Sequence, residues 1–253
     1  MFSFLVGDIP LVRDTTFLTQ YADDANILLS FRTKNPDAIH LDINEQLSRI
    51  RDWCTLNKQE LNVGKSKLML SLRTQLLLKD LPAPTVRSLK VLGVCFNSRL
   101  TWDDHIEMLC RKAYQRMHIL RTLKPFTTKE EIHDVYLAII RSMFDYCCPV
   151  FVSLPDKLRK RIRRVEVRAH RIIFGDRLNC ECNFDGLQRR REKLSLNLLD
   201  KILSNQEHLL HGRLPRSLSF GHRLANFPCR TNKRLHSFFP FTTQLHNKRA
   251  QRK

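Results

Sequence analysis

The sequence lacks the features that mark membrane proteins and secreted proteins. No stretch of its 253 residues approaches the roughly 18 apolar residues that a membrane span needs, so we expect no membrane partner. The apolar residues 1–6 have no basic segment before them and no cleavage-site pattern, so we expect no secretory signal. The eight cysteines are irregularly spaced, which is not typical of a disulfide framework. This spacing predicts reduced thiols in an intracellular protein, with the cytoplasm and the nucleus both open.

The cysteines and histidines also lack the regular pairing of a zinc site. Cys180 and Cys182 are separated by one residue, and His208 and His211 by two. Zinc sites usually combine Cys-x2–4-Cys and His-x3–5-His pairs. We therefore expect the cysteines to be ordinary thiols and not zinc ligands.

The distribution of charge points to a polyanionic partner. Hydrophobic residues make up 42% and charged residues 27% of the chain, proportions that favour a globular protein over a disordered one. Residues 1–110 contain 13 Lys and Arg against 13 Asp and Glu, whereas residues 111–253 contain 31 against 12. The whole net charge of +19 therefore lies in the second part. Nucleic acid is the expected partner, because phosphate contacts from Lys and Arg release counterions and drive binding.

Hydrophobic periodicity predicts an α+β fold. Short apolar runs at residues 68–72 and 91–96 indicate strands, and an amphipathic pattern from Asp37 onward indicates a helix. From Trp102 onward the spacing of apolar residues is three and four, which is typical of helices. A further helix is expected to begin at Thr127 or Thr128 and to bury the apolar residues Ile132, Val135, Tyr136, Ile139 and Met143.

Two adjacent carboxylates, Asp23 and Asp24, lie between two short apolar runs. These runs predict a hairpin over residues 16–31 with the acidic pair at its tip. Like charges placed side by side repel, so the pair is explained either by a bound divalent cation or by a solvated acidic turn. Oxygen ligands of this kind suit Mg2+, which binds through one or two carboxylates together with substrate phosphates.

The acidic pair belongs to a wider set of motifs. In chain order these are Met1-Phe2-Ser3-Phe4-Leu5-Val6-Gly7-Asp8-Ile9-Pro10, Tyr21-Ala22-Asp23-Asp24, Leu61-Asn62-Val63-Gly64-Lys65-Ser66-Lys67, Leu89-Lys90-Val91-Leu92-Gly93-Val94, Leu100-Thr101-Trp102-Asp103-Asp104-His105-Ile106, and Arg230-Thr231-Asn232 with Ser237-Phe238-Phe239-Pro240. In order and spacing they resemble the reverse transcriptase of non-LTR (LINE-type) retrotransposons, over its C-terminal palm and thumb. The resemblance covers nearly the whole chain.

The resemblance implies an RNA-directed DNA polymerase fold and specific site residues. It implies a palm over residues 1–102, a helical thumb over 103–175 and a basic C-terminal region over 176–253. It implies catalytic and Mg2+-binding roles for Asp23 and Asp24, and primer contacts for Tyr21, Leu92 and Gly93. It also implies that Lys65 protonates the leaving pyrophosphate, although a lysine in a turn explains the same sequence. The partners would be an RNA template and a DNA primer, with dNTP in the intact parent enzyme.

Other parts of the family's polymerase have no counterpart that we recognise in this sequence. These are an earlier palm strand with a metal-binding Asp, a Gln-Gly segment that shapes the nucleotide pocket, and the fingers. Two-metal phosphoryl transfer needs two cations roughly 3.5–4 Å apart, and half of that clamp is missing here. We therefore expect a truncated palm that is inactive alone. The alternative is a non-catalytic basic nucleic-acid-binding module derived from such an enzyme.

The densest basic stretch is residues 157–171. Its apolar residues recur at helical spacing, at Leu158, Ile162, Val165, Ala169 and Ile172. This pattern predicts a helix that packs one face on the protein and turns its basic residues outward. The residues expected to contact template or primer phosphates are Lys160, Arg161, Arg163, Arg164 and Arg168. A solvated basic face, a nuclear-import signal and an element that binds acidic lipid are the alternatives.

Overall fold

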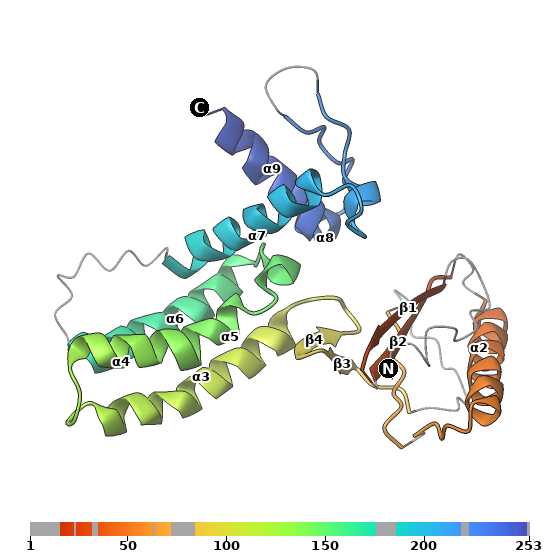
Figure 1. Ribbon diagram of the computed structural model, residues 1–253, viewed down its shortest axis with the longest axis horizontal. Coiled ribbons are helices and arrows are strands. Elements are labelled where there is room, and N and C mark those ends of the chain that lie inside the picture. Colours follow the sequence, from red (N-terminus) through yellow and green to blue (C-terminus); the bar gives the residue numbers. More distant parts are fainter. Residues whose placement is uncertain are drawn as a thin grey trace. The chain divides into compact units, whose positions relative to one another are not determined.

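The computed structural model describes residues 16–22, 24–31, 35–62, 64–71, 84–175, 186–218 and 223–251, which form helices and small antiparallel sheets (Figure 1). The chain divides into two compact units, Met1–Thr101 and Trp102–Lys253. Both two-stranded sheets lie in the first unit, and the described part of the second unit is mainly helical. This arrangement confirms the predicted α+β class. The division into palm, thumb and C-terminal region stays a prediction.

A β-hairpin opens the described part of the first unit. Strand β1 (Thr16–Tyr21) pairs antiparallel with β2 (Asp24–Leu29), and Tyr21 lies opposite Asp24 in the last pair before the turn. Ala22 has a positive φ of 52°, a left-handed conformation that a tight hairpin turn requires. The predicted hairpin is therefore confirmed.

Helix α2 (Pro36–Leu56) follows the hairpin. It begins at Asn35, whose side-chain oxygen accepts a hydrogen bond of 3.0 Å from the backbone N–H of Asp37. Pro36 stands in the first turn, where a missing N–H leaves no helical bond unmade. Its buried face consists of Ile39, Ile43, Gln46, Ile50 and Trp53. The predicted helix is confirmed.

The expected single strand over residues 91–96 is wrong. The structure instead forms a second hairpin, in which β3 (Ser88–Val91) pairs antiparallel with β4 (Val94–Asn97). The turn consists of Leu92 and Gly93, whose φ angles are 46° and 86°. Two successive positive φ angles are typical of the two-residue turn whose twist suits a hairpin. In the other expected strand, residues 68–72, Leu68 forms an isolated parallel bridge with Thr85, and residue 72 lies outside the described residues.

The second unit is built from helices that share one apolar core. In chain order its described elements are α3 (Asp103–Leu123), α4 (Lys129–Tyr136), a π-helical turn (Leu137–Arg141), α5 (Ser142–Asp145), a 3-10 turn (Cys148–Phe151), α6 (Asp156–Phe174), α7 (Gly186–Ser204), a second 3-10 turn (His211–Arg213), α8 (Asn232–Leu235) and α9 (Phe238–Ala250). The core extends from Ile106 on α3 to Leu187 on α7. None of the described helices is long and apolar enough to cross a membrane.

The start of α4 shows the predicted N-cap at Thr128. The Thr128 hydroxyl oxygen accepts a hydrogen bond of 3.3 Å from the backbone N–H of Glu131, and the Glu131 carboxylate accepts one of 2.8 Å from the backbone N–H of Thr128. These two bonds form a capping box, which satisfies two backbone donors that the first helical turn leaves unpaired. The Glu131 carboxylate also accepts a hydrogen bond of 3.0 Å from the Thr128 hydroxyl, and the bonds that it accepts from the backbone and side chain of Thr128 lower its pKa.

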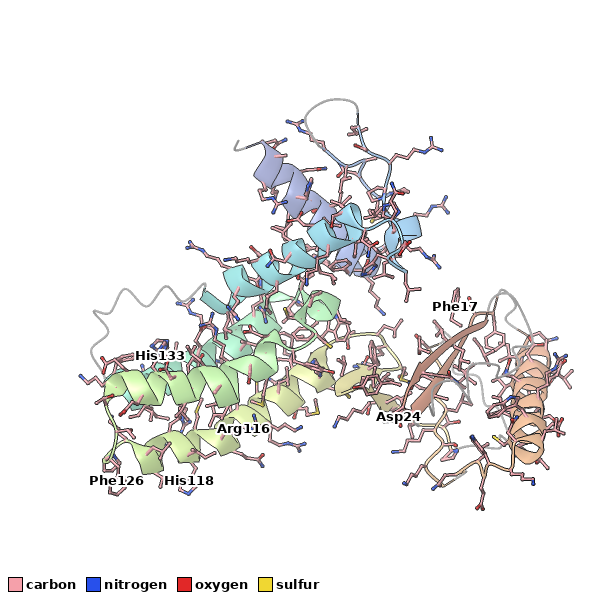
Figure 2. The ribbon with its side chains drawn as sticks, viewed as in Figure 1. Phe17, Asp24, Arg116, His118, Phe126 and His133 are labelled. Carbon is pink, nitrogen blue, oxygen red and sulfur yellow. The ribbon has the colours of Figure 1, made fainter. Side chains whose placement is uncertain are left out.

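A π-helical turn after α4 changes which residues face the core. The buried positions are four residues apart, at Ile132, Tyr136, Ile140 and Phe144. In a regular α-helix each such step rotates by about 40°, so this stripe would drift away from the core. The extra residue of the π turn reverses the drift. The carbonyl of Ile139 in this turn accepts a hydrogen bond of 2.5 Å from Arg116 on α3, a residue labelled in Figure 2.

The π turn also corrects part of the sequence-based pattern. Regular helical spacing placed Ile139 and Met143 on the buried face. Both are only half-buried at the margin of the core, because the inserted residue moves the buried positions to Ile140 and Phe144.

Charged side chains are buried where α6 meets α7. Glu166 is 9% exposed and Arg191 only 2%. Burial raises the pKa of Glu166 to about 7, although Arg141, Arg191 and a hydrogen bond from the backbone of Leu187 lower it. Burial likewise lowers the pKa of Arg191. The stability of this packed region should therefore depend on the protonation of Glu166.

We expect Glu166 to make the protein less stable as the pH rises from about 4.5 to about 7. In this range the unfolded chain releases the proton of Glu166 while the folded chain retains it, so a rising pH favours unfolding. Glu166→Gln removes this loss while keeping the side chain's size. The free energy of unfolding of the variant, measured by urea titration, should rise relative to wild type by on the order of 2–3 kcal/mol between pH 5 and pH 7.5.

The difference between variant and wild type isolates Glu166 from the histidines that also titrate in this range. Glu130→Gln removes an exposed carboxylate of the same unit and is the matched control. A Glu166→Gln difference that stays constant with pH would show that this carboxylate is ionised in the folded chain throughout.

Candidate nucleic-acid interface

Helix α6 separates its apolar and basic residues onto opposite faces. Its buried positions include Leu158, Ile162, Val165 and Ala169, as the sequence pattern predicts. Ile172 is only half-buried, and Ile173 takes the last buried position. Because 3.6 residues make one turn, the basic residues between these positions face outward, whereas Glu166 is buried with the apolar residues. The apolar contacts therefore fix which way the basic residues point.

The outward face of α6 lines an open groove of about 910 Å³. Its lining residues are Tyr114, Lys124, Lys160, Arg163, Arg164, Val167, Arg168, Arg171, Ile172 and Gly175. Six of these ten are Lys or Arg, and none of these described lining residues is Asp or Glu. A concave surface of one charge sign concentrates its field, which raises the local concentration of a polyanion.

The groove also contains one exposed aromatic ring. Tyr114 of α3 is 40% exposed, and the guanidinium carbon of Arg168 lies 5.7 Å from the centre of its ring. A cation over a ring at this distance is attracted by the electrons of the ring face. The contact directs the side chain of Arg168 from α6 toward Tyr114 on α3.

Carboxylates engage two basic residues of α6 that lie outside the groove. Arg159 forms an ion pair with Asp156, and Arg161 lies 3.9 Å from the carboxylate of Glu107 on α3. Neither arginine lines the groove. Four of the five basic residues expected to contact phosphates, Lys160, Arg163, Arg164 and Arg168, thus come together, and Arg161 does not join them.

The acidic hairpin of the first unit is only partly described. Asp24, labelled in Figure 2, is exposed at the start of β2, and Tyr21 opposite it is 66% exposed. Asp23 lies outside the described residues. Among the residues that the structure describes, no group of three or more His, Cys, Asp or Glu could hold a metal ion. Asp24 alone supplies one carboxylate, so the described residues do not by themselves form a Mg2+ site.

The remaining predicted site residues of the first unit lie in turns. The backbone N–H of Lys65 donates a hydrogen bond of 3.0 Å to the side chain of Asn62, and the hydroxyl of Ser66 donates one of 2.9 Å to the Asn62 carbonyl. These bonds close a turn that leaves the Lys65 side chain exposed. Leu92 and Gly93 form the exposed tip of the second hairpin. Their roles in primer binding and catalysis stay predictions.

Two groove residues escaped the sequence analysis. Tyr114 and Lys124 belong to α3 and to the residue that ends it, and no local pattern connects them with the basic stretch on α6. Only the packing of α3 against α6 brings them together. Arg171, in contrast, follows Arg164 and Arg168 at helical spacing, so the sequence pattern could have predicted it on the same face.

Comparison with known proteins places similar sequences in transposons. The chain is 27% identical over 211 residues to "Probable RNA-directed DNA polymerase from transposon BS" of Drosophila melanogaster, a match that covers 79% of this chain. It is 22% identical over 210 residues to "Probable RNA-directed DNA polymerase from transposon X-element" of the same organism, again over 79% of the chain. The chain spans 22% of the length of each of these relatives.

No protein-family profile and no solved structure matches the chain. The two transposon polymerases nevertheless confirm the resemblance that the motifs predicted. Over about four fifths of its length, this chain is similar in sequence to a segment of the RNA-directed DNA polymerases of non-LTR retrotransposons.

Proposed function

We propose that this chain is a palm and thumb fragment of a non-LTR reverse transcriptase, and that α6 binds the phosphate backbone of template or primer. The observation that carries the proposal is the groove whose described lining holds six cations and no carboxylate. Lys and Arg side chains placed along one surface bind phosphates whatever the base sequence is. The similarity to transposon polymerases makes RNA and DNA the fitting polyanions.

The chemistry of the intact parent enzyme is part of the same proposal. There Asp23 and Asp24 would hold Mg2+ for nucleotidyl transfer to a DNA primer, with Lys65 as the acid and dNTP as the second substrate. Tyr21, Leu92 and Gly93 would lie near the primer end. Since the described residues do not complete a metal site, we assign no catalytic step to this chain alone.

A second candidate function is a non-catalytic basic module derived from such an enzyme. It is favoured by one observation: every residue that lines the groove belongs to the second unit, which has its own apolar core. Binding through α6 therefore needs no contribution from the acidic hairpin. Both candidates predict that this chain alone is inactive, so only measured polymerase activity would exclude the second one.

The first test is the salt dependence of binding. Arg163→Ala with Arg164→Ala removes two cations from the groove, and both side chains are exposed, so the helix should still fold. Each phosphate that the variant no longer neutralises should flatten the slope of log affinity against log salt, by about 0.7 on a single strand or about 0.9 on a B-form duplex. Fluorescence anisotropy with labelled oligonucleotides measures this slope.

Arg159→Ala with Arg161→Ala is the matched control for this test. It removes the same charge from the same helix, but at positions that pair with Asp156 and Glu107 outside the groove. The control should keep the wild-type slope. Equal slopes for the groove variant and the control would contradict the proposal and place the phosphate contacts elsewhere.

The second test is polymerase activity. We expect this chain alone to show no RNA-templated DNA synthesis on poly(rA)/oligo(dT) with Mg2+ or Mn2+, because two-metal transfer needs more ligands than the acidic pair provides. Incorporation should equal that of the Asp23→Asn variant. Incorporation above this control would show that the chain holds a complete site and would reject the non-catalytic alternative.

A further inference from the structure

We propose that the groove along α6 takes up a single strand of nucleic acid, with a base stacked on the ring of Tyr114. The inference rests on the proposed phosphate binding by α6 and names the form of nucleic acid that the groove selects. It draws on the ring of Tyr114, on the apolar residues beside the cations, and on the length of the groove.

Tyr114 is a large, partly exposed ring placed among cations. It belongs to α3, yet it contacts Arg168 of α6, so it lies where the two helices meet and not on an isolated surface. The planar guanidinium covers part of the ring, and 40% of the side chain remains exposed. Aromatic rings and arginine planes in a positive groove are the groups on which single-stranded bases stack.

The groove also offers apolar surface to a base. Val167 and Ile172 are half-buried on the same face of α6 as the cations. At the end of the helix, Gly175 has open space where a side chain would begin. A phosphate backbone alone would need none of this apolar surface, whereas a base has two apolar faces to cover.

The cations are spread along the helix and not gathered at one point. From Lys160 to Gly175 the groove follows α6 for about 22 Å, at 1.5 Å per residue. Its cations recur at three and four residue intervals, so they form a continuous row beside the ring. A single strand can follow such a row with its backbone and turn its bases toward Tyr114.

A duplex can contact only the cations of this groove. Its phosphates can contact the cations, but its bases are already stacked inside the helix and present no free face to a ring. The ring and the apolar residues would then face the sugar-phosphate backbone. The exposed aromatic therefore favours single strands over duplexes, without preference for base sequence.

The experiment compares Tyr114→Ala and Tyr114→Phe with wild type, in the full chain. The probes are a single-stranded RNA, a single-stranded DNA and a DNA duplex of about 12 nucleotides, a length within the usual single-strand site sizes. Tyr114→Ala should weaken binding of both single strands by about 5- to 140-fold and leave duplex binding and the salt slope unchanged. Tyr114→Phe keeps the ring and should bind like wild type.

An abasic oligonucleotide of the same length completes a thermodynamic cycle. It carries the same phosphates without bases, so Tyr114→Ala should cause no further loss with this probe. If Tyr114→Ala leaves single-strand affinity unchanged, or weakens the duplex and the abasic strand equally, the stacking proposal is wrong.

The outcomes separate this proposal from the one on which it rests. A flattened salt slope in the Arg163→Ala, Arg164→Ala variant, together with wild-type binding by Tyr114→Ala, overturns the stacking and keeps phosphate binding by α6. Equal slopes for that variant and its Arg159→Ala, Arg161→Ala control overturn both. Circular dichroism of each variant confirms that α3 and α6 remain folded.

Discussion

The packing of α6 against α3 and α4 is the interaction on which the second unit depends. Leu158, Ile162, Val165 and Ala169 are almost fully buried there. A large apolar side chain contributes about 1.5–3 kcal/mol when it is fully buried. The same packing decides the electrostatics, because it leaves the cations of α6 only the outward side. A change that loosened the apolar stripe would therefore disperse the basic groove as well as destabilise the fold.

The sequence was sufficient where structure follows from local pattern. The hairpin at Asp24, the helix predicted from Asp37 onward and the N-cap, predicted at Thr127 or Thr128 and found at Thr128, each depend on neighbouring residues. The basic helix was predicted for the same reason, since its apolar residues recur at helical spacing.

Sequence-based prediction failed where the structure depends on backbone conformation or on contacts between residues far apart in the chain. Leu92 and Gly93 look like part of an apolar strand, but their backbone turns there, and hydrophobicity alone does not show it. The π turn shifts the buried positions by one residue, and its Ile139 carbonyl accepts a hydrogen bond from Arg116 of α3, a distant contact that no local pattern shows. Tyr114 enters the candidate site for a similar reason: its place beside Arg168 exists only after α3 and α6 pack together.

The π turn gives this stretch an uncommon tolerance to changes of chain length. Losing one residue between Leu137 and Arg141 would turn the segment into regular α-helix, and the residues beyond it would keep the face they present to the core. Insertions and deletions in proteins are usually confined to surface loops, because a helix that gains or loses a residue rotates everything after it. Here the rotation is already built into the helix, so related chains can differ in length inside the core of this unit without repacking it.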